Sequence, residues 1–395
     1  MKYLFFILTL ISLISCNSKV IEVQNLKEGS LVSTNSIKMV SEKSFILDST
    51  TAPKSKYSQI YLDNYGKRYF TFFNRYDNSI CFYDYENLNL INKIKYQKKG
   101  PNGILMPMGY HIKNMDSIFI YNKHQNQLVL TNREGVVLNR ISLINNSNIK
   151  NNKWILKYPQ YYPRTVTPLF EYKDKLLLTG QFMWSMPDSL IDTFKFTTEV
   201  NLKDNNLSFK NYYPQELYGF GVNWDHVIYK EVFSDLNNDR DFLVLSFPIS
   251  HDLYISDLNT NQYRKVYGGS NFAGTITSVN TPKGKSTPER KEMQHVEETD
   301  LYSAIKYDKY DKVYYRFIRR ALRKNDINFK WKDKELAIIA MDENFKYLGE
   351  TNIGKWGDWN WENSFVTKEG LNIEFLNHDD INEVALILKI FKIEK

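Results

Sequence analysis

The sequence predicts an all-β protein, because short apolar runs separated by polar turns recur along its 395 residues. The clearest unit covers residues 67–96. Within it, 69–73 is aromatic on both faces, 75–78 is a polar turn, and 79–85 is a second apolar run that an alternating segment follows. Aromatic and β-branched runs bounded by Asn, Asp and Gly are typical of strands. We therefore expect this unit to form three successive strands of one sheet.

The same unit recurs six times, which is the signature of a repeat architecture. The corresponding strands are expected at 69–73, 117–121, 176–179, 242–246, 313–317 and 371–375. A polar turn separates each of them from an earlier apolar strand, and later apolar segments follow, so each unit has four strands. After the first two copies, the spacing exceeds the roughly 40 to 50 residues of common propeller blades, which indicates insertions in the loops.

Six such units could form a sandwich, a barrel or a propeller, and the distribution of apolar residues along the strands distinguishes these three architectures. Strands of a sandwich or barrel alternate apolar and polar residues, whereas strands of a sheet covered on both faces are continuously apolar. The runs 69–73, 118–121 and 242–245 are continuous. Radially packed blades cover both faces, so the sequence predicts a six-bladed β-propeller of four-stranded antiparallel blades. We expect 37–47 to close the ring as the outer strand of the blade that ends at 385–393.

The N-terminus has the pattern of an export signal. Lys2 precedes a mostly apolar run at 3–13, which is too short to span a membrane, and Leu13-Ile-Ser-Cys16 follows. This pattern resembles the bacterial lipobox, in which Cys16 is diacylated and becomes the mature N-terminus. The resemblance implies a signal peptide at 1–15, followed by a polar tether at 16–34. The six repeated units then predict a single propeller domain at 35–395. The alternative is an ordinary secretory peptide with an incidental cysteine.

The residues after Cys16 bear on which membrane the anchor would reach. Asn17 is not the aspartate that resembles an inner-membrane retention signal, so the outer membrane is favoured. The acidic cluster often seen in surface-displayed lipoproteins does not follow, which favours the periplasmic face over the cell surface. The first expected partner is therefore a membrane, reached through a lipid anchor at Cys16.

Composition narrows the class of protein. With 42% hydrophobic, 15% aromatic and 25% charged residues, the chain has ample material for a core and is not disordered. The net charge of +7 comes from interleaved signs, and no nucleic-acid-binding motif accompanies it, so we expect no nucleic-acid partner. Of the two cysteines, Cys81 has no partner once Cys16 is acylated, and its apolar neighbours predict a buried thiol.

Two further features support a resemblance to a known group. A Gly-Pro-Asn-Gly junction at 100–103 and an Asn-Arg-Glu-Gly turn at 132–135 accompany the lipobox and the six degenerate units. Together they resemble the six-bladed propeller lipoproteins of unknown function from Bacteroidota, whose fold is similar to the TolB-like and NHL-like propellers. The resemblance covers nearly all of 35–395 and implies no catalytic residues.

Propeller topology predicts which loops share a face. Turns between second and third strands and connections between blades emerge together, on what we call the junction face. Ligand-binding residues expected on this face are Arg75, Tyr76, Lys123, His124, Trp184, Trp224, His226, His251, Arg319 and Trp359. Exposed aromatic side chains among Arg and His suit stacking on sugars or contacts to carboxylates. The alternative is that the tryptophans fill the ends of the blades as core.

The insertion at 268–298 is a polar blade connection on the same face, expected to be either a ligand lid or a surface excursion without structure of its own. Asp235, Asn237, Asp239 and Asp241 resemble the opening of a calcium loop, but Arg240 and Ser246 stand where the required Gly and Glu would be. A charged hairpin turn is the favoured interpretation. We expect no metal and no cofactor.

These observations favour a lipid-anchored envelope protein that binds a carbohydrate, an anionic small ligand or an envelope protein through the junction face. One alternative is a glycan-directed hydrolase or lyase, which would need an acid/base pair near the axis, such as His226 with the neighbours of Asp225 or His251 with Asp252. Another is a scaffold of an envelope complex, with a flat face and a filled axial channel. The sequence favours binding over catalysis, because no catalytic motif is present.

Overall fold

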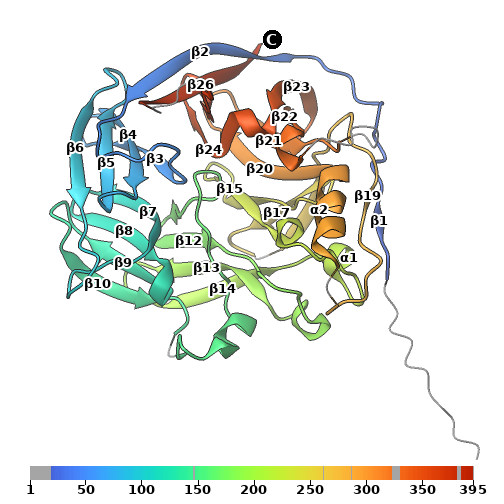
Figure 1. Ribbon diagram of the computed structural model, residues 1–395, viewed down its shortest axis with the longest axis horizontal. Coiled ribbons are helices and arrows are strands. Elements are labelled where there is room, and N and C mark those ends of the chain that lie inside the picture. Colours follow the sequence, from blue (N-terminus) through green and yellow to red (C-terminus); the bar gives the residue numbers. More distant parts are fainter. Residues whose placement is uncertain are drawn as a thin grey trace, which may run out of the picture.

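The computed structural model describes residues 19–145, 147–260, 262–285, 287–322, 330–379 and 384–394. Six four-stranded antiparallel sheets are arranged radially in a ring (Figure 1). This arrangement confirms the predicted six-bladed β-propeller. Each of blades 1 to 5 runs in chain order from the axis outward.

The strand bounds follow blade by blade. Blade 1 contains β3 (Ser58–Leu62), β4 (Arg68–Asn74), β5 (Ser79–Asp84) and β6 (Leu90–Lys95). Blade 2 contains β7 (Pro107–Asn114), β8 (Ser117–Asn122), β9 (Gln127–Thr131) and β10 (Val137–Ser142). Blade 3 contains β11 (Phe170–Tyr172), β12 (Lys175–Thr179), β13 (Lys195–Asn201) and β14 (Leu207–Tyr212).

Blade 4 contains β15 (Phe233–Asn237), β16 (Phe242–Ser246), β17 (Asp252–Asp257) and β18 (Tyr263–Tyr267). Blade 5 contains β20 (Leu301–Asp308), β21 (Val313–Arg319), β22 (Glu335–Asp342) and β23 (Tyr347–Lys355). Blade 6 contains β24 (Trp359–Thr367), β25 (Gly370–Phe375), β26 (Ala385–Glu394) and β2 (Ser36–Ile46). A short pair, β1 (Glu22–Val23) with β19 (Ile276–Thr277), and two helices, α1 (Gln215–Tyr218) and α2 (Glu289–Glu298), lie outside the blades.

The burial of the strands explains why their runs are continuously apolar. Every residue of β5, β16 and β21 is buried, because these middle strands are covered by a neighbouring blade on each side. The outermost strands β6 and β18 carry exposed positions. The free thiol of Cys81 is buried in the middle of β5, as predicted, and burial raises its pKa to about 11.

The ring is closed by the N-terminal strand, as predicted. β2 pairs antiparallel with β26 from Ser36 opposite Glu394 to Ile46 opposite Ala385. Phe45 of β2 is fully buried, and its ring centroid lies 4.7 Å from that of Phe70 in blade 1. Aromatic side chains thus fill the wedge between the last blade and the first.

The residues before β2 lie against the ring over their described part, instead of hanging free as a tether. β1 pairs with β19, and the side-chain amide of Asn25 donates to the carbonyl oxygens of Ser270 and Ala273 at 2.8 and 2.7 Å. Figure 1 shows β1 running beside β19 along one edge of the ring.

The insertion at 268–298 has structure of its own, contrary to the expectation of an irregular loop. It contains β19 and the ten-residue helix α2. Ala273, Ile276 and Val296 are buried in the main core cluster, so three apolar residues fix this otherwise polar segment. Among the described residues, no helix is long and apolar enough to cross a membrane.

Candidate functional site

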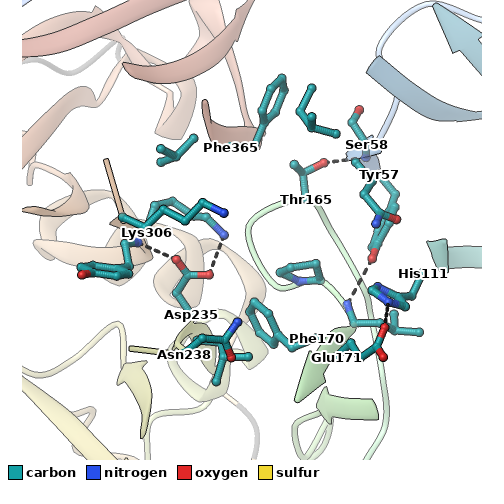
Figure 2. Close-up of a pocket in the computed structure, with 18 of the residues that line it drawn as sticks. Tyr57, Ser58, His111, Thr165, Phe170, Glu171, Asp235, Asn238, Lys306 and Phe365 are labelled. Atoms are coloured by element: carbon teal, nitrogen blue, oxygen red, sulfur yellow. Dashed lines mark hydrogen bonds and ion pairs between the residues drawn. The ribbon is translucent and has the colours of Figure 1, made fainter. Parts of the chain in front are cut away.

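A cavity of about 370 Å³ lies at the propeller axis and is lined by the innermost strands of all six blades (Figure 2). Its polar lining includes Gln59, His111, Glu171, Asp235 and Lys306, and its apolar lining includes Ile60, Leu169, Phe170, Phe365 and Val366. We call this cavity the axial pocket. The innermost strands of blades 1 to 5 each place at least one polar side chain in it, beside the apolar ones.

The segment 164–169 closes one end of the axial pocket. The Thr165 hydroxyl accepts a hydrogen bond from the backbone N–H of Ser58 at 2.8 Å and donates to Asn363 Oδ1 at 2.6 Å. It therefore joins blade 1 to blade 6. The Arg164 guanidinium pairs with Glu231, next to blade 4, and with Glu362 in blade 6. Contacts to blades 1, 4 and 6 place this segment across the axis on the junction face.

The other end of the axial pocket is open. Asn238, Asp239 and Lys309 line it and are exposed, whereas Ser58 and Thr165 at the closed end are buried. The three exposed residues lie in turns between first and second strands, which emerge opposite the junction face. We call this side the pocket face.

An ion pair between blades 4 and 5 forms one wall. Lys306 Nζ lies 2.9 Å from Asp235 Oδ1, and the backbone N–H of Tyr307 donates to the other carboxylate oxygen. Both side chains are more than nine-tenths buried. Burial raises the pKa of Asp235, and the neighbouring ammonium of Lys306 opposes this effect. Asp239 is also paired with a lysine, Lys312. Because both carboxylates of this segment are paired with lysines, the structure supports a charged hairpin turn and not a calcium-binding loop.

A second ionic contact joins blades 2 and 3 at the opposite wall. His111 Nε2 lies 3.0 Å from one carboxylate oxygen of Glu171, and Lys113 pairs with the other oxygen. The hydrogen bond from His111, together with Lys113, lowers the pKa of Glu171 to about 2 despite partial burial. Glu171 is therefore ionised at neutral pH.

Aromatic rings complete the axial pocket. Phe170 and Phe365 approach the cavity from different blades in Figure 2. The Tyr57 hydroxyl accepts a hydrogen bond from the backbone N–H of Leu169 at 3.1 Å, and burial raises its pKa. The Ser58 hydroxyl is buried and makes no hydrogen bond within the described structure. The site thus combines apolar ring faces with polar groups whose charges largely compensate one another.

The predicted site residues occupy three kinds of environment. Arg75, Tyr76, His124 and Trp184 are exposed, and Lys123 and His226 are half-buried. Lys123 places its ammonium 4.0 Å from the ring centroid of Tyr162. Cys16 lies outside the described residues. The exposed members fit the predicted surface, and whether any of them binds a ligand stays a prediction.

Four predicted residues are buried, so the expectation of exposed side chains is wrong for them: Trp224, His251, Arg319 and Trp359. The indole N–H of Trp224 donates to the Leu217 carbonyl at 2.7 Å, and that of Trp359 donates to the Ile353 carbonyl at 3.2 Å. Both tryptophans are core residues, as the alternative interpretation held, Trp359 at the start of β24 and Trp224 in the connection between blades 3 and 4. Nearby aromatic side chains supply the contacts that an exposed indole would lack.

The side chains of His251 and Arg319 are also buried and contact other residues inside the protein. The His251 ring nitrogens contact the Tyr302 hydroxyl at 2.8 Å and the Val23 carbonyl at 3.1 Å, so the ring does not pair with Asp252. Burial lowers its pKa to about 4. The Arg319 guanidinium lies 4.5 and 5.1 Å from the ring centroids of Trp356 and Trp361, and burial lowers its pKa to about 10.

None of the ten predicted residues belongs to the described lining of the axial pocket, which opens on the other face. The signal that could have located it is a titratable or amide side chain in each innermost strand of blades 1 to 5, which the pocket lining shows to be Gln59, His111, Glu171, Asp235 and Lys306. Within the described ranges, no group of three or more His, Cys, Asp or Glu side chains could hold a metal ion.

Comparisons with known proteins find solved structures that resemble this chain. A member of the DUF4221 family from Bacteroides vulgatus has a similar crystal structure, with a TM-score of 0.75, 22% identity, and coverage of 92% of this chain and 100% of that one. A protein of Bacteroides fragilis whose name describes it as exported has a TM-score of 0.54 and 10% identity, covering 92% of this chain and 98% of that one. No curated protein sequence matches.

The family comparison agrees with the resemblance seen in the sequence. The profile of the DUF4221 family, a domain of unknown function, matches residues 36–352. The match begins at the ring-closing strand β2 and ends within β23 of blade 5. The chain belongs to the DUF4221 family.

Proposed function

We propose that the protein is a lipid-anchored envelope binding module that holds a small, neutral, polar ligand in its axial pocket, with carbohydrate as the ligand class. The observation that carries the proposal is a cavity closed at one end and lined by side chains from all six blades. Pockets formed by convergent rigid elements are the usual location of small-molecule sites.

The chemistry of the lining favours a sugar. Phe170 and Phe365 offer apolar faces for the C–H side of a pyranose ring, while Gln59 and Asn238 are neutral hydrogen-bonding groups at its edge. The three carboxylates Glu171, Asp235 and Asp239 offset the positive charge of the nearby lysines. The site therefore offers no excess positive charge that would favour an anionic ligand. A volume of about 370 Å³ lies at the lower end of the range for small-molecule sites.

The anchor in this proposal is Cys16. It is supported by the lipobox pattern and by the exported description of the structurally similar Bacteroides fragilis protein. We place the protein at the outer membrane, with the periplasmic face favoured. Labelling with radioactive palmitate tests this part, because a Cys16→Ser variant is expected to lose the label and to leave the membrane fraction.

Calorimetric titration with a panel of monosaccharides and disaccharides tests the pocket. A sugar that binds the wild-type protein is expected to bind Phe170→Ala at least tenfold more weakly. Phe272→Ala is the matched control, because this aromatic residue is 59% exposed and does not line the axial pocket. Equal losses in both variants, or no sugar binding to the wild type, would contradict the proposal.

A glycan-directed hydrolase or lyase is the second candidate, because titratable side chains do meet within hydrogen-bond distance in the axial pocket. The contacts are His111 with Glu171 and Lys306 with Asp235. Binding is favoured because each carboxylate is already engaged by a cation. Incubation with oligosaccharides tests catalysis: new reducing ends or unsaturated products that disappear in His111→Gln would favour the enzyme.

A further inference from the structure

The first described residue fixes where the chain leaves the ring. The backbone N–H of Lys19 donates to the Gly221 carbonyl at 3.1 Å, and Lys19 forms a parallel bridge with Val222. Cys16 lies three residues earlier, and three extended residues span at most about 11 Å. A lipid attached to Cys16 would therefore begin close to the Gly221 loop, which follows helix α1 (Figure 1).

Three connections meet around this loop. The backbone N–H of Gly221 lies 3.2 Å from a carboxylate oxygen of Asp188, and Lys283 pairs with the same carboxylate. Asp188 belongs to the connection between β12 and β13, Gly221 to the connection from blade 3 to blade 4, and Lys283 to the insertion between blades 4 and 5. All three connections emerge on the junction face.

Large apolar side chains are exposed at this place. Phe220 is 81% exposed immediately before Gly221, Trp184 is 48% exposed a few residues before Asp188, and Val20 is 42% exposed beside Lys19. Lys19 and Lys285 are exposed around them. Aromatic side chains with lysines are the combination that favours the interface of a bilayer with anionic lipids.

We infer that the junction face over blades 3 and 4 lies on the lipid bilayer, with Phe220 and Trp184 in the interfacial region. This inference rests on the lipid anchor of the proposed function and adds an orientation to it. The short distance from Cys16 to the Gly221 loop identifies a bilayer as the occupant, in place of a second copy or a protein partner. The axial pocket then opens away from the membrane, toward the aqueous compartment.

Site-specific labelling of the lipidated full-length protein in liposomes tests the orientation. In the lipidated form of the protein the Cys16 thiol is blocked, and Cys81 is buried, so an introduced cysteine is the only reactive position expected. In the test variant, Phe220→Cys, an environment-sensitive fluorophore is attached to the introduced cysteine. Tyr65→Cys is the matched control, because Tyr65 is 96% exposed in the turn between β3 and β4, on the pocket face. Both substitutions are at exposed positions, and thermal melting verifies that both variants fold.

The readout is quenching by a lipid-attached quencher in vesicles that contain anionic lipid. We expect at least threefold stronger quenching at position 220 than at position 65, with a blue-shifted emission at 220 alone. Equal quenching, or stronger quenching at 65, would overturn the orientation. Mass spectrometry of the same samples reports acylation separately: an acylated protein with equal quenching refutes only the orientation, whereas an unmodified Cys16 refutes the anchor and the orientation together.

Discussion

Lys306 Nζ lies 2.9 Å from Asp235 Oδ1 across the boundary between blades 5 and 4, with both side chains buried in the wall of the axial pocket. Removing one member of a buried ion pair leaves an uncompensated charge. We therefore expect Lys306→Met to lower the free energy of unfolding by about 3 to 5 kcal/mol, measured by chemical denaturation. Lys312→Met is the control, because Lys312 pairs with Asp239 at the surface and should change stability little. Similar losses in both variants would contradict this prediction.

Ring closure by β2 gives a second prediction. Phe45 is fully buried against Phe70, so Phe45→Ala removes the main contact of the closing strand with blade 1. We expect a loss of about 3 to 5 kcal/mol in the free energy of unfolding. Met39→Ala lies on the same strand at a position that is 51% exposed and should cost far less. A Phe45→Ala variant as stable as the wild type would show that ring closure depends only on the backbone pairing of β2 with β26.

The buried His251 makes stability depend on pH. Its folded pKa is about 4, below the ordinary value of 6.5, so the unfolded chain binds a proton that the folded protein does not. This contribution to stability is complete above pH 6.5 and is lost as the pH falls toward 4, by up to about 3 kcal/mol. Urea denaturation from pH 7.5 to 4.5 should show a shallower decline in His251→Gln. Identical slopes would mean that His251 does not titrate in this range.

Substitution of two exposed turn residues, one on each face of the propeller, can show on which face the ligand binds. Asn238 borders the axial pocket on the pocket face, and Arg75 lies on the junction face where the sequence predicted the site. If sugar occupies the axial pocket, Asn238→Ala is expected to weaken binding about 5- to 30-fold, which corresponds to one lost hydrogen bond of roughly 1 to 2 kcal/mol. A loss that follows Arg75→Ala instead would return the site to the junction face. Calorimetry with the same sugar measures both variants.

The fold could be predicted because a blade covered on both sides imposes continuous apolar runs, such as 69–73 and 242–246. The closing strand was identifiable because one apolar segment near the N-terminus had no unit of its own. The insertion at 268–298 was misjudged, since Ala273, Ile276 and Val296 are too widely spaced to form a periodic pattern.

The candidate site was harder to predict because its residues are scattered. His111, Glu171, Asp235 and Lys306 each belong to a different strand, and only the closed ring brings them together. The environment of a tryptophan near a blade end is hard to predict for a physical reason: the same residue type is buried where neighbouring elements cover its whole ring and exposed where they leave part of the ring uncovered. Trp359 and Trp184 show the two outcomes.

The pairing of β2 with β26 also has a consequence for biogenesis. The two strands lie at opposite ends of the polypeptide, so blade 6 cannot be completed until the C-terminal strand has been synthesised. Until then the edge of β2 that pairs with β26 in the folded protein has no partner strand, and an unpaired edge is open to pairing with the wrong strand. If the chain is exported as proposed, this order of synthesis keeps the ring open until the last strand of blade 6 has arrived.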